Sequence, residues 1–256
     1  MLKAYDEQLR TDAETSGAVS VTRHGPLRLI TFEGGRGFIS YQDLDGADEA
    51  GIEALVEAAV AHFDADAAIE EVEWKTRGHD HAPGLHETLL RHGFVKEEPE
   101  SIMVGEARLL AVDVAVPEGV RLRSITDVED VRAAGIMQDS VFDSPTSASR
   151  LEDLVRRLAA GECEMWVAEA DGEIVSAGRI DPVAGTEFAG IWGGATLERW
   201  RGRGIYRALT AARARTAIAL GKRYIHSDST EFSRPILERS GLVKVGTTTP
   251  YVRSFG

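Results

Sequence analysis

Cysteine is nearly absent from this 256-residue sequence, in which Cys163 is the one residue of its type. A single cysteine cannot form an intrachain disulfide, so a disulfide-stabilised fold is excluded, and a reducing cytoplasm is the compartment that we expect. Cys163 stands just before the apolar run Met165-Trp166-Val167. This position predicts an unreactive thiol in the core or at a strand edge.

Long apolar runs and excess positive charge are also missing. No stretch approaches the ~18 consecutive apolar residues of a transmembrane helix, and the N-terminus lacks the apolar region of a secretory signal, so we expect no membrane association. The net charge is −13; residues 1–117 contain 10 Lys and Arg against 23 Asp and Glu, whereas residues 118–256 contain 19 of each sign. An acidic chain is a poor general binder of nucleic acid, and its surface weakly favours a cationic substrate such as an amine.

The rest of the composition is that of a folded protein. Hydrophobic residues make up 43% of the chain, which is enough for a buried core. The length fits one large domain or two small ones. Pro117 and Gly119 interrupt residues 111–119, so this segment predicts a linker between a domain over residues 1–113 and a domain over residues 118–256.

Both halves alternate between strand and helix patterns. In the first half we expect helices over residues 2–14, 48–63 and 84–92, and strands over residues 18–22, 27–32, 37–41, 72–75, 94–95 and 101–104. In the second half we expect helices over residues 126–139, 148–160, 205–220 and 234–240, and strands over residues 120–124, 164–170, 173–180, 188–197, 224–226, 242–245 and 251–255. Thr126 and Glu129 have the spacing of a capping box, with Thr126 as the N-cap.

One short sequence occurs twice. Residues 91–96 (Arg-His-Gly-Phe-Val-Lys) match residues 239–244 (Arg-Ser-Gly-Leu-Val-Lys) in type and spacing, at an offset of 148 residues. Each copy follows an expected strand and helix. The offset is far too long for a solenoid repeat and favours duplication of a whole domain.

The most informative segment is residues 199–206, Arg-Trp-Arg-Gly-Arg-Gly-Ile-Tyr, between an expected strand and a long expected helix. Glycine lets the backbone approach a ligand closely, and a helix N-terminus offers unpaired N–H groups and the positive end of a dipole. Six arginines fall between residues 199 and 215, with Glu198 as the only acid beside them. This combination predicts a site for a pyrophosphate, such as that of coenzyme A.

Other phosphate-binding loops fit this segment less well. A Walker loop requires Gly-Lys-Ser/Thr, which does not follow, and the dinucleotide fingerprint requires a third glycine where Arg207 stands. The residues alone leave one alternative open, which is a plain glycine turn before an exposed, arginine-rich helix.

The segment resembles motif A of the GNAT superfamily, Gln/Arg-x-x-Gly-x-Gly/Ala, at Arg199, Gly202 and Gly204. Residues 233–242 resemble motif B, and the order of expected elements over residues 120–256 is similar to that of the family. The first half resembles a degenerate GNAT domain without the Arg-x-x-Gly-x-Gly string. The resemblance implies an α/β (α+β) fold of two GNAT-like domains, each a mixed, mostly antiparallel sheet flanked by helices, of which residues 118–256 form the catalytic one.

The resemblance also implies the chemistry. It implies an acyl-CoA-dependent N-acetyltransferase in which an amine attacks acetyl-CoA directly in a ternary complex, with a small-molecule or peptide acceptor, no metal, and a monomer or homodimer in the cytoplasm. Backbone groups of residues 195–197 are expected to pair with the pantetheine arm, and N–H groups of residues 201–205 to hold the pyrophosphate. The residues expected at the cofactor are Ala195, Thr196, Leu197, Arg199, Arg201, Gly202, Arg203, Gly204, Ile205, Tyr206 and Ser233.

The resemblance implies a Glu general base on the strand before motif A, and Glu187 is the only carboxylate at the start of that strand. Asp181 and Asp228 remain alternatives, as does a base that acts through water.

The sequence departs from the family pattern in motif B. Thr230 stands where an Asn is often found, and Leu237 where a Tyr often protonates the leaving thiolate. Protonation is then left to water or to another phenol, for which Tyr206, Tyr224 and Tyr251 are the candidates.

Two other functions are weighed against this one. A non-catalytic acyl-CoA-binding or sensing protein is suggested by Thr230 and Leu237, and turnover of an amine separates it from an enzyme. A nucleic-acid binder using the arginine-rich helix is disfavoured by the net charge of −13. Residues 79–86 contain His and Asp side chains that zinc accepts, but their spacing spans a loop and a helix start, so a solvated loop is expected there.

Overall fold

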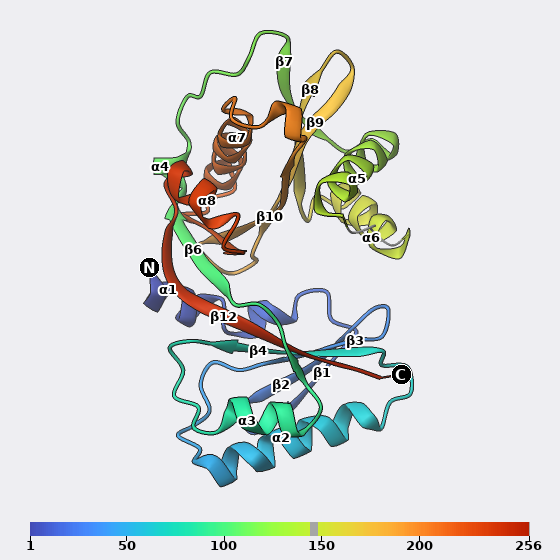
Figure 1. Ribbon diagram of the computed structural model, residues 1–256, viewed down its shortest axis with the longest axis vertical. Helices are drawn as coiled ribbons and strands as arrows, with labels where there is room; N and C mark the ends of the chain where they lie inside the picture. The colour runs from blue at the N-terminus through green and yellow to red at the C-terminus, as the bar shows by residue number, and fades with distance from the viewer. Residues whose placement is uncertain (144–147, 256) are drawn as a thin grey trace. The chain divides into compact units, whose positions relative to one another are not determined.

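The computed structural model describes residues 1–143 and 148–255. Its fold is α/β, with mostly antiparallel strands flanked by helices (Figure 1). The chain divides into two compact units: unit 1 comprises residues 1–103, residues 228–234 and the chain from Lys244 onward, and unit 2 comprises residues 104–227 and 235–243. These units differ from the contiguous domains expected from the sequence, because the C-terminal strand belongs to unit 1.

Unit 1 contains the strands β1, β2, β3, β4 and β12, which are neighbours in that order. The strands are β1 (Ser20–His24), β2 (Leu27–Phe32), β3 (Arg36–Ser40), β4 (Glu71–Arg77) and β12 (Val243–Ser254). Neighbours are antiparallel except β3 and β4, which are parallel and are joined through helix α2 (Glu49–Asp64). The remaining elements are α1 (Leu2–Gln8), the 3-10 helix η1 (Asp12–Thr15), α3 (Leu85–Arg91) and β5 (Val95–Lys96), which pairs with β12.

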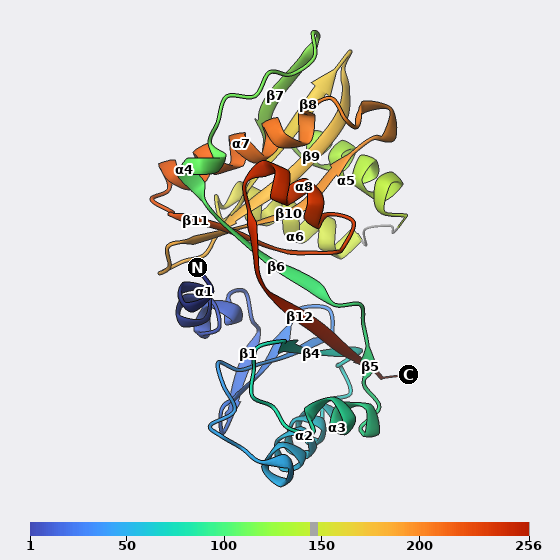
Figure 2. The same cartoon turned by 60° about the vertical axis from the view of Figure 1, so that its left-hand side comes forward.

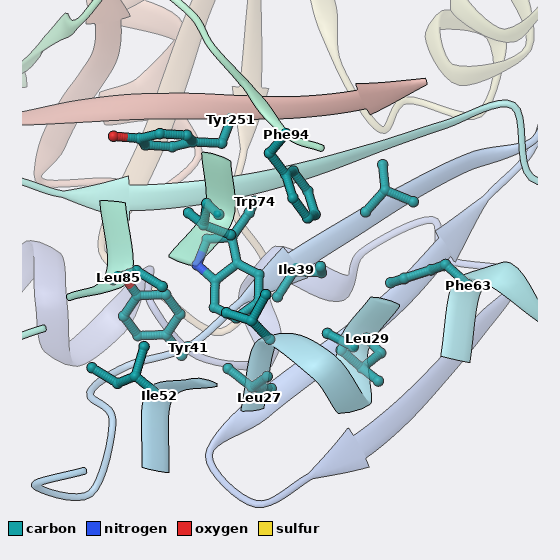
Figure 3. Packing of buried hydrophobic residues seen from close by; sticks show 14 of the residues in the cluster. Leu27, Leu29, Ile39, Tyr41, Ile52, Phe63, Trp74, Leu85, Phe94 and Tyr251 are labelled. Atoms are coloured by element: carbon teal, nitrogen blue, oxygen red, sulfur yellow. The ribbon is translucent and has the colours of Figure 1, made fainter. Parts of the chain in front are cut away.

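One face of the unit 1 sheet is apolar and is covered by α2 and α3. Trp74 of β4 is fully buried there and meets the ring of Phe94 edge-on, at 6.4 Å between centroids (Figure 3). Ile52 and Phe63 of α2 supply part of the same core. Alternation along β4 places Glu73, Lys75 and Arg77 on the opposite face, as period-two geometry requires.

Unit 2 contains the strands β7, β8, β9, β10 and β11, which are neighbours in that order, and the last two residues of β11 belong to unit 1. The strands are β7 (Val120–Ile125), β8 (Glu164–Ala170), β9 (Glu173–Pro182), β10 (Phe188–Thr196) and β11 (Tyr224–Ser229). Neighbours are antiparallel except β10 and β11, which are parallel and are joined through the 3-10 helix η2 (Glu198–Trp200) and helix α7 (Ile205–Ala219). The other elements are β6 (Glu100–Glu106), which begins in unit 1, α4 (Ala107–Leu110), α5 (Val128–Phe142), α6 (Ala148–Ala159) and α8 (Arg234–Ser240).

Helices cover both faces of the unit 2 sheet (Figure 2). Val167 of β8 packs in the core that includes Val131 of α5, whereas its neighbour Ala168 packs in the core that includes Leu209 of α7. Successive residues of a strand point to opposite faces, so α5 and α7 lie on opposite sides of the sheet. No helix among residues 1–143 and 148–255 is both long and apolar enough to cross a bilayer.

The repeated hexapeptide adopts the same local structure in both places. Gly93 and Gly241 follow α3 and α8 with φ of +83° and +110°. The next N–H bonds back into the helix in each case, from Phe94 to the Leu89 carbonyl at 3.0 Å and from Leu242 to the Leu237 carbonyl at 3.1 Å. A left-handed glycine is the usual way to end a helix, so sequence and structure agree here.

Several local expectations need correction. The first helix ends at Gln8 and a separate 3-10 helix follows. The N-cap of α5 is Asp127, whose carboxylate accepts the Glu129 N–H at 2.9 Å, rather than Thr126. The loop expected around residues 79–81 is present with both histidines exposed, but the Asp80 side chain is covered and accepts both terminal nitrogens of Arg10 at 2.7 and 2.9 Å.

Candidate cofactor and active site

The candidate cofactor loop joins the end of β10 to the start of α7. Gly202 and Gly204 have φ of +74° and +81°, a conformation that favours glycine. Gly204 is the N-cap of α7, and no side chain caps this helix. Among the described residues, no protein acceptor is recorded for the N–H groups of residues 202–205, so they remain open to an anion. The Arg201 N–H, in contrast, is already bonded to the Glu198 carbonyl at 3.1 Å.

The arginine side chains of the loop are exposed, and two of them have no acidic partner. Arg199 pairs with Glu173. Arg201 donates to the Thr196 carbonyl at 3.1 Å, and Arg203 lies over the Trp200 ring at 4.9 Å. Within the described part of the chain neither Arg201 nor Arg203 forms an ion pair, so both charges are free for phosphate. Beside the loop lies a hollow of about 600 Å³, lined by Ser140, Val141, Leu197, Glu198, Arg199 and Arg201.

The strands before and after α7 diverge. Parallel pairing between β10 and β11 covers Phe188–Gly190 against Tyr224–His226, whereas β10 continues to Thr196. From Ile191 onward, the β11-facing edge of β10 has no strand partner in the described residues. An extended ligand arm can add to such an edge by backbone hydrogen bonds.

A bulge interrupts β10 at the point where this free edge approaches the loop. The register with β9 shifts between Trp192 and Ala195, and Gly193 has φ of +62°. The Gln138 amide of α5 donates to the Gly193 carbonyl at 2.5 Å. From the other face, Tyr206 of α7 lies against Gly194: a Cβ at that position would be 2.6 Å from the tyrosine hydroxyl. Bulges re-aim backbone groups, so this is where an N–H can turn toward a reacting carbonyl.

The expected pantetheine contacts are partly occupied by the protein itself. Leu197 donates its N–H to the Val175 carbonyl at 3.0 Å, so this N–H is not left for a cofactor, and its carbonyl already accepts the Trp200 N–H at 2.8 Å. The Ala195 carbonyl accepts the Ser176 hydroxyl at 2.6 Å. Pairing with a pantetheine arm therefore falls to the remaining groups of β10.

Two of the carboxylates expected as bases, Glu187 and Asp181, do not lie at the bulge. Glu187 precedes β10, is half-exposed, and lies 3.8 Å from Arg223. It is six residues from Gly193, which is ~20 Å along a strand. Asp181 of β9 is opposite Gly190 and accepts from the Arg179 guanidinium at 2.9 and 3.0 Å. Asp228 belongs to unit 1, where it receives the Lys75 ammonium at 2.5 Å.

The residues of motif B have structural partners. Ser233 lies in unit 1, where its N–H bonds to the Thr230 carbonyl at 3.1 Å and its hydroxyl to the Thr230 hydroxyl at 3.1 Å. Leu237 is 2% exposed and packs inside unit 2. Cys163 is buried as expected, and burial raises the pKa of its thiol to about 11, so it remains protonated at neutral pH.

Unit 1 contains the same strand–helix–strand crossover without the loop. Helix α2 joins the parallel strands β3 and β4 as α7 joins β10 and β11. Its N-terminus is closed by Asp48, whose carboxylate accepts the Gly51 N–H at 2.9 Å. Asp43, Asp45 and Glu49 add further negative charge beside it. An anionic cofactor is repelled here and attracted at α7.

Among the residues that the structure describes, one group of potential metal ligands lies elsewhere in unit 1. Ligand atoms of Glu53, Glu57 and His92 lie within 4.8 Å of one another. Glu53 already accepts hydrogen bonds from Arg91 and His92, and these bonds hold its pKa below the ordinary value. The arrangement is that of an ion-paired surface cluster on α2 and α3.

Comparison with known proteins agrees with this geometry. Residues 105–227 match the family model of the acetyltransferase (GNAT) domain. No curated protein matches the chain. Residues 105–227 therefore form a segment that is similar to the GNAT acetyltransferases, a family that uses acetyl-CoA.

Solved structures with a similar fold cover nearly the whole chain. A GCN5-related N-acetyltransferase from Kribbella flavida is 16% identical, with a TM-score of 0.73 over 96% of each chain. A functionally unknown conserved protein from Staphylococcus epidermidis is 14% identical, with a TM-score of 0.70 over 98% of this chain and 99% of that one. A tandem GNAT protein from the clavulanic acid biosynthesis pathway is 14% identical, with a TM-score of 0.63 over 90% of this chain and 78% of that one. At these identities the likeness concerns the fold.

Proposed function

We propose that the protein is an acetyl-CoA-dependent N-acetyltransferase that transfers the acetyl group to an amine by direct attack in a ternary complex. The observation that supports this most strongly is the uncapped N-terminus of α7, with two glycines at positive φ and the unpaired Arg201 and Arg203. The pyrophosphate of the cofactor lies on this loop, and the pantetheine arm runs back along the free edge of β10. The thioester then reaches the bulge at Gly193 and Gly194.

The acceptor in this proposal is an amine of a small molecule or peptide. The net charge of −13 favours a cationic acceptor over a nucleic acid. Unit 1 is a degenerate GNAT-like domain, supported by its own parallel crossover and by the repeated hexapeptide. The protein acts in the cytoplasm, as a monomer or homodimer, without a metal and without binding membranes.

A panel of amines assayed for acetyl-CoA-dependent thiol release tests the proposal. Release of free coenzyme A together with a product heavier by one acetyl group is the expected result. Tight binding of acetyl-CoA without turnover of any polyamine, amino acid, amino sugar or peptide amine would instead support a non-catalytic acyl-CoA-binding protein.

A further inference from the structure

Arg213 is a buried cation whose recorded protein partners are all neutral. It lies on α7, is 1% exposed, and donates to the Thr210 hydroxyl at 3.2 Å and to the carbonyls of Leu209 and Arg179 at 3.3 and 3.5 Å. No carboxylate in the described part of the chain pairs with it, and burial lowers its pKa. Burying an uncompensated charge is costly, so packing alone does not account for an arginine here.

The guanidinium is directed at Tyr206, which lies two helical turns earlier on the same face of α7. Its central carbon is 5.7 Å from the centre of the tyrosine ring, so the guanidinium lies against this side chain. Arginine has donors only, so toward this guanidinium the tyrosine oxygen can act only as an acceptor. The hydroxyl hydrogen is then free to point elsewhere, and no acceptor for it is recorded among residues 1–143 and 148–255.

The hydroxyl lies at the bulge of β10. It is so close to Gly194 that a Cβ there would be 2.6 Å away, and Gln138 fixes the adjacent Gly193 carbonyl from the opposite face of the sheet. The other two phenols named above are placed differently. Tyr224 stacks on Phe188 at the far end of β10, and Tyr251 of unit 1 bonds to His86 at 2.7 Å.

We infer that Tyr206 is a catalytic residue that passes a proton to the departing sulfur, and that Arg213 is the positioning residue that holds it at the bulge. The inference rests on the proposed function. The amine nitrogen bonds to the thioester carbon, the carbon–sulfur bond breaks, and its electron pair goes to sulfur, which takes the hydroxyl proton of Tyr206. The resulting phenolate takes up the proton that the nitrogen loses, so no other reactant is consumed.

This step explains why the cation at position 213 has no acid beside it. In the resting protein the guanidinium orients a neutral hydroxyl. While the phenolate exists, that oxygen is the counter-ion of Arg213, which is itself 1% exposed. A fixed carboxylate beside Arg213 would neutralise the cation, and the cation would then no longer stabilise the phenolate.

A double-mutant cycle on the full-length protein tests the inference. Tyr206→Phe removes the hydroxyl and is expected to lower kcat by ~10²-fold or more, the usual effect of losing a general acid, while the Kd for acetyl-CoA changes less than about 2-fold. Arg213→Met is expected to lower kcat by at least about 10-fold in the wild-type background. In the Tyr206→Phe background the same change is expected to cost less than about 2-fold, because Arg213 acts through the hydroxyl.

Tyr224→Phe is the matched control, since it removes a phenol of the same unit away from the bulge and is expected to keep kcat within about 2-fold. A Tyr206→Phe enzyme with near wild-type kcat overturns the inference whatever Arg213→Met does, even if that variant fails to fold. Equal losses from Arg213→Met in both backgrounds overturn the positioning role. Absence of acetyl-CoA turnover in the wild type overturns the proposed function and the inference together, whereas turnover that survives Tyr206→Phe overturns the inference alone.

Discussion

At the scale of single residues, the placement of Glu187 has the clearest consequence. Its carboxylate pairs with Arg223 at 3.8 Å and stands six residues before Gly193 along the chain. Direct proton abstraction at the bulge is beyond its reach. A base that acts from here requires a chain of intervening groups.

The variant Glu187→Gln therefore distinguishes two predictions about turnover, one made from the sequence and one made from the structure. Removal of a true base lowers turnover by at least ~10²-fold. The geometry favours a change of less than about 2-fold in kcat, with unchanged affinity for acetyl-CoA. Steady-state kinetics and calorimetry on the variant decide between them, and a loss of ~10²-fold would restore Glu187 to the mechanism.

The residues also show what the sequence could predict. The apolar run after Cys163 predicts its burial correctly, because burial there follows from the local pattern. Arg213 is one of six arginines in its segment, and the sequence does not mark it as the buried one. Its guanidinium packs against Gly178 of β9, where an added Cβ at position 178 would be 2.6 Å from the guanidinium. The sequence does contain one indication that Arg213 lies beside Tyr206: Tyr206, Thr210 and Arg213 have the spacing i, i+4 and i+7, which places them on one helix face.

At the scale of elements, the contrast between α7 and α2 favours anion binding at α7. Both helices follow a strand and precede a parallel neighbour. The first turn of α7 is open, whereas Asp48 occupies that of α2. This difference between the two helix N-termini comes from the side chains of a single turn, so it can be predicted from the sequence.

Gly202→Asp tests the loop most sharply, with Gly202→Asn as its control. Both side chains tolerate positive φ better than most, and no heavy atom lies within 4 Å of a Cβ at this position, so the fold should persist. The aspartate adds a negative charge where we propose that the pyrophosphate binds. We expect acetyl-CoA to bind at least ~10-fold more weakly to the aspartate variant than to the asparagine variant. Equal affinities by calorimetry would remove the pyrophosphate from this loop.

Most elements agree with the sequence patterns, and the exceptions have physical causes. The last strand was expected in two pieces because Gly246 and Pro250 interrupt it, but pairing of Thr248–Ser254 with β4 holds it as the single strand β12. Helix α4 was not expected because it is only four residues long. Such short elements depend on tertiary contacts rather than on periodicity.

At the scale of the whole molecule, the two units are not contiguous in sequence. Residues 228–234 and the chain from Lys244 onward belong to unit 1, although they follow the motif A helix of unit 2. No local sequence pattern predicts that these segments belong to unit 1, because their assignment depends on which strand pairs with the final strand. The Lys75–Asp228 ion pair, 2.5 Å long, links segments 153 residues apart inside unit 1.

The central claim is that one site, on the loop before α7, binds the cofactor. Calorimetric titration of the full-length protein with acetyl-CoA tests it most directly. The account predicts a stoichiometry near one, because the equivalent helix of unit 1 is capped by Asp48 and surrounded by acids. A stoichiometry near two, or no binding at all, would contradict it.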